Sequence, residues 1–247
     1  MPNGFLVAFA VLGSAVRAST VRAPIGRVTA LDRRKLNTSP DSNFYESLKL
    51  VTHCDDAFVT ALTNLYNERI SGSRVLDFMA SHVSHLPEDR LCELYVTGHG
   101  MNADELAANP ALSERHVADL NIEPSLPFAA TASYDAILCC AGVQYLQEPE
   151  AIFAECARAL KPHGVLIVSF TDKFFFPKAI QGWIDRGMAT RAKLVKDYMR
   201  AAGGFSDIEI VGGGTSLLAQ LGSICGLGGD PFVAVVGTRA AESDGIE

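Results

Sequence analysis

The chain has 247 residues, of which 48% are hydrophobic, 20% charged and 8% aromatic. This is the composition of an ordinary globular protein, and it excludes a disordered, collagen-like or coiled-coil chain. The length allows one large domain or two small ones, and one α/β domain is the simpler expectation.

The net charge of −7 is unevenly distributed. Residues 1–36 carry six basic side chains and one acidic side chain, a balance of +5, which leaves −12 for the remaining 211 residues. An acidic body without a basic cluster repels a phosphate backbone, so we expect no nucleic-acid partner. The six cysteines include no Cys-x-x-Cys pair and are too few for a disulfide scaffold. We therefore expect them to be reduced and mostly buried.

The amino-terminal segment resembles a targeting peptide. Residues 5–16 are a run of twelve apolar or small residues, too short to span about 30 Å of hydrocarbon as a helix, so we expect no integral membrane span. An acid-poor stretch with Arg17, Ser19 and Arg22 follows. We expect residues 1–40 to be a leader, cleaved or disordered, that directs the protein to an organelle, a plastid rather than a mitochondrion. The alternatives are a cytoplasmic or secretory protein, or a start codon assigned too far upstream.

Helices and strands alternate beyond residue 40. Apolar residues at helical spacing predict a helix over 55–70, which Gly72 ends. Asn102 followed by Glu105 matches a capping box and predicts a second helix. Pro149 begins a third helix, and a fourth helical region covers 178–202. Short apolar segments predict strands at 74–78, 94–97, 116–118, 134–140, 165–170, 208–211 and 232–236.

Strands that are apolar on both faces and alternate with helices are typical of parallel sheets. The sequence therefore predicts a doubly wound, mostly parallel seven-stranded sheet in residues 41–240, followed by a flexible tail at 241–247. Ligands bind such sheets beyond the carboxyl ends of the strands. The candidate binding residues are hence those that directly follow each strand.

The order and spacing of four stretches resemble the class I S-adenosylmethionine (SAM)-dependent methyltransferases, most closely the type 11 group, over roughly residues 45–237. The stretches are Val-Leu-Asp at 75–77, Ala-Asp-Leu at 118–120, Tyr-Asp-Ala-Ile at 134–137 and Leu-Lys-Pro-His-Gly-Val at 160–165. The resemblance implies a Rossmann-like methyltransferase fold, SAM as the cofactor and methyl transfer to a small-molecule acceptor. The alternative is an inactive methyltransferase-like binding or assembly module. A nicotinamide reductase is disfavoured, because no Gly-x-Gly-x-x-Gly follows the first strand.

The resemblance also implies roles for individual residues. Asp77 would lie near the methionine end, where a carboxylate pairs with an ammonium group. Asp119 would accept a hydrogen bond from the adenine amino group, while Leu120 offers its backbone N–H to the ring. In each case an aspartate that forms a turn is the structural alternative. The residues assigned to the cofactor are Asp77, Ala80, Ser81, Gly98, Gly100, Met101, Asn102, Asp119, Leu120 and Ala141.

Two loops depart from the family pattern. The first loop is usually Gly-x-Gly-x-Gly, whereas here it is Met-Ala-Ser-His-Val at 79–83. Either the backbone approaches the ligand less closely than in the family, or Ser81 and His82 supply side-chain contacts in place of bare amides. If these side chains filled the crevice, only the architecture would remain. The family acid that holds both ribose hydroxyls is replaced by Gly100. Asn102 is then expected to bond a hydroxyl, and Met101 to pack on the adenine.

Methyl transfer from a sulfonium mainly requires alignment, so no catalytic acid or base is obligatory. A base would assist transfer to a hydroxyl, and the candidates are His82, His85, Gln144 and Tyr145. Two histidines without further ligands make an incomplete metal site, so we expect no metal. Phe174, Phe175, Phe176 and Trp183 indicate an apolar or aromatic acceptor, although a buried core cluster explains them equally well.

Overall fold

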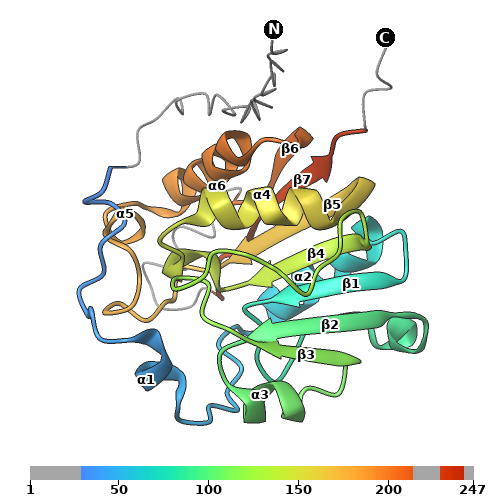
Figure 1. Ribbon diagram of the computed structural model, residues 1–247, viewed down its shortest axis with the longest axis horizontal. Coiled ribbons are helices and arrows are strands. Elements are labelled where there is room, and N and C mark those ends of the chain that lie inside the picture. Colours follow the sequence, from blue (N-terminus) through green and yellow to red (C-terminus); the bar gives the residue numbers. More distant parts are fainter. Residues whose placement is uncertain (1–28, 214–228, 242–247) are drawn as a thin grey trace, which may run out of the picture.

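The computed structural model describes residues 29–213 and 229–241 (Figure 1). Its strands form one sheet in the order β3-β2-β1-β4-β5-β7-β6. β7 runs antiparallel to its neighbours β5 and β6, whereas the other pairs are parallel. The doubly wound, mostly parallel seven-stranded sheet is therefore confirmed. The strands are β1 (Arg74–Phe78), β2 (Tyr95–Gly100), β3 (Glu114–Val117), β4 (Tyr134–Cys140), β5 (Leu160–Phe170), β6 (Phe205–Gly212) and β7 (Val233–Arg239).

The predicted helices are present, and α1 (Asp41–Tyr45) and two short 3₁₀ helices occur in addition to them. The region predicted as one helix over 178–202 forms two helices, separated before Gly187, which caps the second. The α-helices are α1 (Asp41–Tyr45), α2 (Asp56–Arg69), α3 (Ala103–Ala108), α4 (Pro149–Ala159), α5 (Gln181–Ile184) and α6 (Met188–Ala202). Short 3₁₀ helices cover Glu88–Glu93 and Val143–Tyr145. None of the helices in the described ranges is both long and apolar enough to cross a membrane.

Local capping explains where the helices begin. The Asp55 carboxylate accepts a hydrogen bond from the Phe58 N–H at 2.8 Å and caps α2. Asn102 caps α3 by accepting from the N–H groups of Asp104 and Glu105. Pro149 is the first residue of α4, where its missing N–H costs no hydrogen bond.

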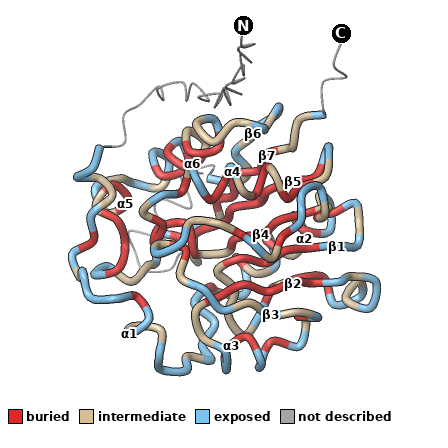
Figure 2. The backbone as a smooth tube through the Cα atoms, viewed as in Figure 1, coloured by how far each residue is buried: buried red, intermediate tan, exposed pale blue. Residues whose placement is uncertain are grey.

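Two buried clusters lie on the two faces of the sheet. Buried residues run along the central strands of the sheet (Figure 2). Helices α4 and α6 cover one face, and α2 lies behind the other (Figure 1). Strand β4 contributes to both clusters, because Ile137 and Cys139 face one side while Ala136 and Leu138 face the other. This double burial is the reason that the strand is continuously apolar.

The described cysteines are free. Cys54, Cys139 and Cys156 are buried, whereas Cys140 is partly exposed and Cys92 is exposed. Cys225 lies outside the described residues. The expectation of reduced, mostly buried cysteines holds for the residues that the structure describes.

Residues 29–40 pack against the domain. Arg33 forms an ion pair with Glu150 at 2.8 Å, and the Gln181 N–H donates to the carbonyl oxygen of Arg34 at 2.7 Å. The domain boundary that we placed at residue 41 is therefore wrong, since these long-range contacts include residues 29–40 in the domain. The apolar run at 5–16 and residues 242–247 of the predicted tail lie outside the described residues.

Residues 41–53, here called the strap, include α1 and are fixed at their start by a buried ion cluster. Asp41 pairs with Lys35 and, at 3.1 Å, with Lys178, and it accepts a hydrogen bond from Asn121 at 3.0 Å. Burial acts to raise the pKa of Asp41, but the hydrogen bond and charge of Lys35 outweigh it and hold that pKa below its usual value. The cluster joins the strap to the segment before α5.

Candidate active site at the strand ends

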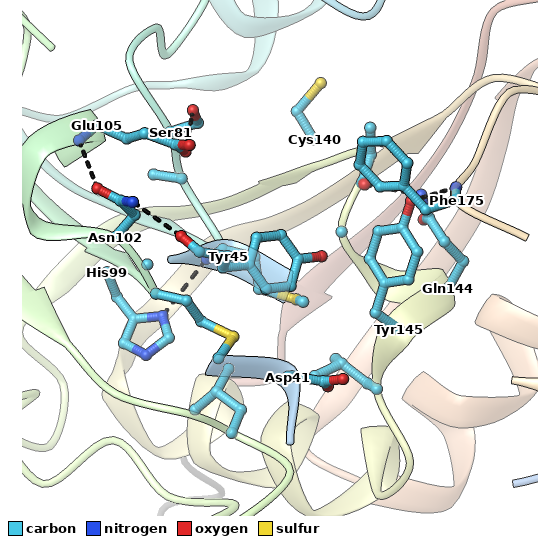
Figure 3. Close-up of a pocket in the computed structure, with 18 of the residues that line it drawn as sticks. Asp41, Tyr45, Ser81, His99, Asn102, Glu105, Cys140, Gln144, Tyr145 and Phe175 are labelled. Carbon is cyan, nitrogen blue, oxygen red and sulfur yellow. Dashed lines mark hydrogen bonds between the residues drawn. The ribbon is translucent and has the colours of Figure 1, made fainter. Parts of the chain in front are cut away.

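A cavity of about 270 Å³ lies beyond the carboxyl ends of the parallel strands (Figure 3). The loops that follow β1 to β5 form one part of its wall, and the strap forms the other part. A smaller hollow of about 70 Å³ shares the residues Met79, Ala80 and Ser81 with it. The site therefore lies where the topology predicts a ligand.

Ten of the fourteen predicted site residues line this cavity. They are Ala80, Ser81, Gly100, Met101, Asn102, Asp119, Leu120, Ala141, Gln144 and Tyr145. Asp77, His82 and His85 line the smaller hollow instead. Gly98 lines neither hollow, which corrects its assignment to the cofactor: a Cβ atom at this position would lie 2.3 Å from the Leu112 side chain, so Gly98 packs against Leu112 instead.

The residues that directly follow β1 and β4 adopt a backbone conformation typical of glycine, although neither of them is a glycine. Met79 follows β1 with φ +58°, and Ala141 follows β4 with φ +51°, both in the left-handed region that side chains disfavour. Such strain persists only where surrounding contacts fix it. One such contact is the hydrogen bond from the Ala80 N–H to the carbonyl oxygen of His99, 2.7 Å long. The crevice remains open, because Ser81 and His82 do not fill it.

The end of β2 explains why the family acid is missing. A Cβ atom on Gly100 would lie 2.5 Å from the carbonyl oxygen of Ala80, closer than any real contact of this kind. The loop after β1 and the end of β2 thus approach each other so closely that no side chain fits at position 100. A carboxylate for this part of the cavity has to come from another element.

Glu105 supplies a carboxylate in this region (Figure 3). It belongs to the first turn of α3 and is buried. Its Oε2 accepts from the Ser81 hydroxyl at 2.7 Å, and its Oε1 accepts from the Lys49 N–H of the strap at 2.9 Å. The sequence pattern pointed to a capping role for Glu105, and only the caps from Asn102 form. Ser81 bonds this carboxylate rather than presenting a free hydroxyl.

The residues after β2 and β3 form the part of the cavity expected to hold adenine. The Asp119 Oδ1 accepts from the Asn121 N–H at 2.9 Å, so Asp119 forms a turn and also lines the cavity. Met101 and Leu120 supply apolar surface nearby. The Asn102 amide group donates to the carbonyl oxygens of Tyr45 and Glu46 at 2.8 and 3.2 Å. It therefore holds the strap, and the expected bond to a ligand hydroxyl is not available to its N–H groups.

Asp77 lies at the base of the smaller hollow and is buried. Burial raises its pKa from 3.8 to about 7, although a hydrogen bond with Ser84 acts in the opposite direction. A cationic group in the hollow would favour the ionised carboxylate. This agrees with the role that the resemblance implies for Asp77 at the methionine end.

The far end of the cavity is aromatic. Phe175 lies 5.0 Å from the Phe44 ring and 5.3 Å from the His53 ring, both edge to face. The Tyr145 hydroxyl accepts from the Phe175 N–H at 2.9 Å and fixes this segment (Figure 3). Phe174 and Phe175 line the cavity, whereas Trp183 is buried against Phe170 and belongs to the core. Phe174 and Phe175 are thus in a position to contact an acceptor, whereas Trp183 belongs to the buried core.

Two polar side chains at this end of the cavity, Gln144 and His53, have polar atoms that the described part of the fold does not use. The Gln144 Oε1 is buried and has no hydrogen-bond partner among the described residues, while its Nε2 donates to the carbonyl oxygen of Ala141 at 2.7 Å. His53 of the strap also lines the cavity, and burial lowers its pKa, which favours the neutral imidazole. His53 was missed because its strap has no periodic pattern. Within the described residues, no group of three His, Cys, Asp or Glu side chains is arranged to hold a metal.

Comparison with known proteins identifies a domain in the middle of the chain. Residues 72–168 match the Methyltransf_11 methyltransferase domain. They contain β1 to β4, most of β5, and the loops after β1 to β4 that line the cavity. No protein of curated function matches the sequence.

Solved structures share the fold at low sequence identity. A SAM-dependent methyltransferase from Archaeoglobus fulgidus is 14% identical with a TM-score of 0.52, over 75% of this chain and 95% of that chain. Geranyl diphosphate C-methyltransferase from Streptomyces coelicolor A3(2), in complex with Mg²⁺, geranyl diphosphate and S-adenosyl-L-homocysteine, is 12% identical with a TM-score of 0.50, over 83% and 100%. The [4+2]-cyclase SpnF is 19% identical with a TM-score of 0.50, over 73% and 81%. The likeness concerns the fold, since proteins of different reactions share it.

The fold, the cavity at the strand ends and the domain match agree with one another. Residues 72–168 match a methyltransferase domain of type 11, and the sheet has the Rossmann-like methyltransferase topology. The domain supports SAM-dependent methylation, with S-adenosylmethionine as the cofactor.

The residues present fit this cofactor. A nucleoside needs hydrogen-bond acceptors for an amino group and two hydroxyls, and the cavity offers the carboxylates of Asp119 and Glu105. Met101 and Leu120 supply the apolar surface that a purine ring requires. The buried Asp77 supplies an acceptor for an ammonium group beside the strained loop at Met79.

Proposed function

We propose that the protein transfers the methyl group of SAM to a small-molecule acceptor, which enters at the aromatic end of the cavity. One observation carries this proposal: a single cavity joins the nucleoside side at Asp119 to the aromatic wall at Phe175. Both reactants can therefore bind in one space, which in-line transfer requires.

The cofactor, when bound, supplies an activated sulfonium methyl group. The chain contributes position and exclusion of water. The loops after β1 to β3 orient the nucleoside, and the strap covers the cavity with Tyr45, Lys49 and His53. Holding two reactants in the correct geometry can lower the barrier by about 7–11 kcal/mol. The rigid anchoring of the strap through Asp41 serves this purpose.

The free polar groups at the aromatic end support recognition of a flat acceptor that carries a hydrogen-bond donor. The unpartnered Gln144 Oε1 can accept a hydrogen bond from the acceptor, which satisfies an otherwise costly buried oxygen. The neutral His53 can take up a proton where the nucleophile is a hydroxyl. Tyr145 holds the Phe175 segment, and His82 and His85 face the smaller hollow.

The test of this function has two parts. Calorimetric titration with SAM and S-adenosylhomocysteine measures cofactor binding. Incubation with methyl-labelled SAM and a panel of phenols, anilines, thiols and carboxylic acids measures transfer. Binding with transfer to a panel member supports the proposal. Binding without any transfer supports the alternative of a methyltransferase-like binding module, and no binding of either nucleoside rejects both.

We also propose that the leader directs the protein to an organelle, a plastid in preference to a mitochondrion. The support is the sequence of residues 1–28, which lie outside the described residues. Amino-terminal sequencing of the protein from its native cells tests this proposal, and an intact Met1 would refute cleavage.

A further inference from the structure

We propose that Glu105 binds the ribose hydroxyls of the cofactor and, through Lys49, couples the nucleoside to the strap. This inference rests on the proposed function, because it requires the nucleoside to lie at the strand ends. It assigns the hydroxyl contact to the first turn of α3 rather than to the end of β2, where Gly100 is in contact with Ala80.

The position of Glu105 is the first support. Its carboxylate is buried, lines the cavity, and bonds Ser81 of the loop after β1, which is part of the same cavity wall. Glu105 therefore brings a carboxyl group to the gap between the ends of β1 and β2. This is the place from which the close contact between Gly100 and Ala80 excludes a side chain.

The hydrogen-bonding capacity of the carboxylate is the second support. An ionised carboxylate is only an acceptor and has about four lone-pair sites on its two oxygens. The described residues occupy one site on Oε2, through Ser81, and one on Oε1, through Lys49. A vicinal diol brings two O–H donors, which matches the remaining capacity of the group.

The two other carboxylates that line the cavity, Asp41 and Asp119, are placed for other contacts. Asp41 is paired with Lys35 and Lys178 and is fully engaged in the ion cluster. Asp119 uses one oxygen for the turn at Asn121 on the opposite, adenine side. Glu105 is buried without an ion pair among the described residues, so new donors would lower the cost of its burial.

The bond to Lys49 gives this contact a second consequence. Because Oε1 accepts from the strap backbone, a nucleoside that fixes the Glu105 side chain also fixes the strap at Lys49. Binding of the cofactor is therefore expected to order the wall of the acceptor end.

The experiment compares S-adenosylhomocysteine with its 2′-deoxy and 3′-deoxy analogues by calorimetry. The variants are Glu105→Gln, which keeps the shape of the side chain, and Asp104→Asn, which removes the neighbouring exposed charge of the same turn as a matched control. Thermal unfolding of each variant verifies the fold. Hydrogen exchange of residues 41–53, with and without S-adenosylhomocysteine, reports on the strap.

For the wild-type protein and Asp104→Asn, we expect each deoxy analogue to bind about 10-fold more weakly than S-adenosylhomocysteine. Glu105→Gln should bind S-adenosylhomocysteine about 10- to 100-fold more weakly and discriminate little between it and the analogues. The ligand should slow exchange in the strap of the wild type and less so in Glu105→Gln. Full discrimination retained by Glu105→Gln would overturn the inference while leaving the proposed function intact. Absence of binding to the wild type would overturn both.

Discussion

Gly100 and Ala80 are in contact across the ends of two neighbouring strands, with 2.5 Å between a Cβ atom placed on Gly100 and the carbonyl oxygen of Ala80. The same loop is tied to β2 by the hydrogen bond from the Ala80 N–H to His99. The contact explains both the absent family acid and the tight first loop. The two departures from the family sequence, the missing acid and the different first loop, thus follow from the same close packing.

Gly100→Ala should therefore disturb the site. The methyl group would force the first loop away from β2, which we expect to lower the free energy of unfolding by about 1–3 kcal/mol and to weaken binding of S-adenosylhomocysteine. Gly187→Ala is the matched control, because a Cβ atom there meets nothing within 4 Å. Urea unfolding and calorimetry of the two variants measure the difference. Equal behaviour of both variants would contradict the packing argument.

Asp77 should make the folded protein less stable as the pH rises. Its pKa is about 7 in the folded protein against an ordinary value of 3.8, so between these values the folded state binds the proton more firmly than the unfolded state. The contribution of Asp77 to the free energy of unfolding is then highest near pH 4 and falls as the pH rises to about 7. Asp77→Asn cannot titrate. The difference in free energy of unfolding between wild type and variant should change by at most about 4 kcal/mol over this range. Parallel pH profiles from urea unfolding would be the contrary result.

The same group should make cofactor affinity depend on pH. An ammonium group in the hollow favours the ionised form of Asp77, so binding releases a proton where the free carboxyl is protonated. Affinity for S-adenosylhomocysteine should rise between pH 6 and 8 in the wild type and stay flat in Asp77→Asn. Calorimetry in buffers of different ionisation enthalpy measures the released proton. A flat wild-type profile would remove Asp77 from the methionine end.

Asp119→Asn separates the turn from recognition of the base. The asparagine Oδ1 can still accept from Asn121, so the turn should remain, but an N–H group replaces the second carboxylate oxygen. We expect adenosyl ligands to bind about 10-fold more weakly and the inosyl analogue to bind relatively better. Competition titration with S-adenosylhomocysteine and S-inosylhomocysteine measures this ratio. An unchanged ratio would leave Asp119 as a residue of the turn alone.

Asn102→Asp tests how the strap is held. Aspartate still caps α3 but cannot donate to the carbonyl oxygens of Tyr45 and Glu46. The melting temperature should change little, while backbone amides in residues 41–53 should exchange about 10-fold faster. Asn102→Ala, which also loses the cap, serves as the comparison and should lower stability by about 1 kcal/mol. Unaltered exchange in Asn102→Asp would show that other contacts hold the strap.

Local patterns in the sequence were sufficient for the sheet and for most of the cavity wall. Strand β4 and the cap at Asn102 depend on neighbours in sequence, and residues such as Asp119 follow strands whose carboxyl ends share one edge. The strap was not predictable in this way. It is fixed by the pairing of Asp41 with Lys178, which lies far along the chain, and such a buried ion pair leaves no periodic signal. Glu105 was misinterpreted for the same reason, since a capping pattern does not reveal a contact with Lys49.

The central claim is that a sulfonium nucleoside lies across the ends of β1, β2 and β3 in the described cavity. The most direct measurement is a crystal structure of the protein with S-adenosylhomocysteine. Our account predicts adenine between Met101 and Leu120 with its amino group at Asp119, and the ribose at Glu105. A nucleoside bound elsewhere, or a cavity occupied by side chains of the first loop, would contradict it.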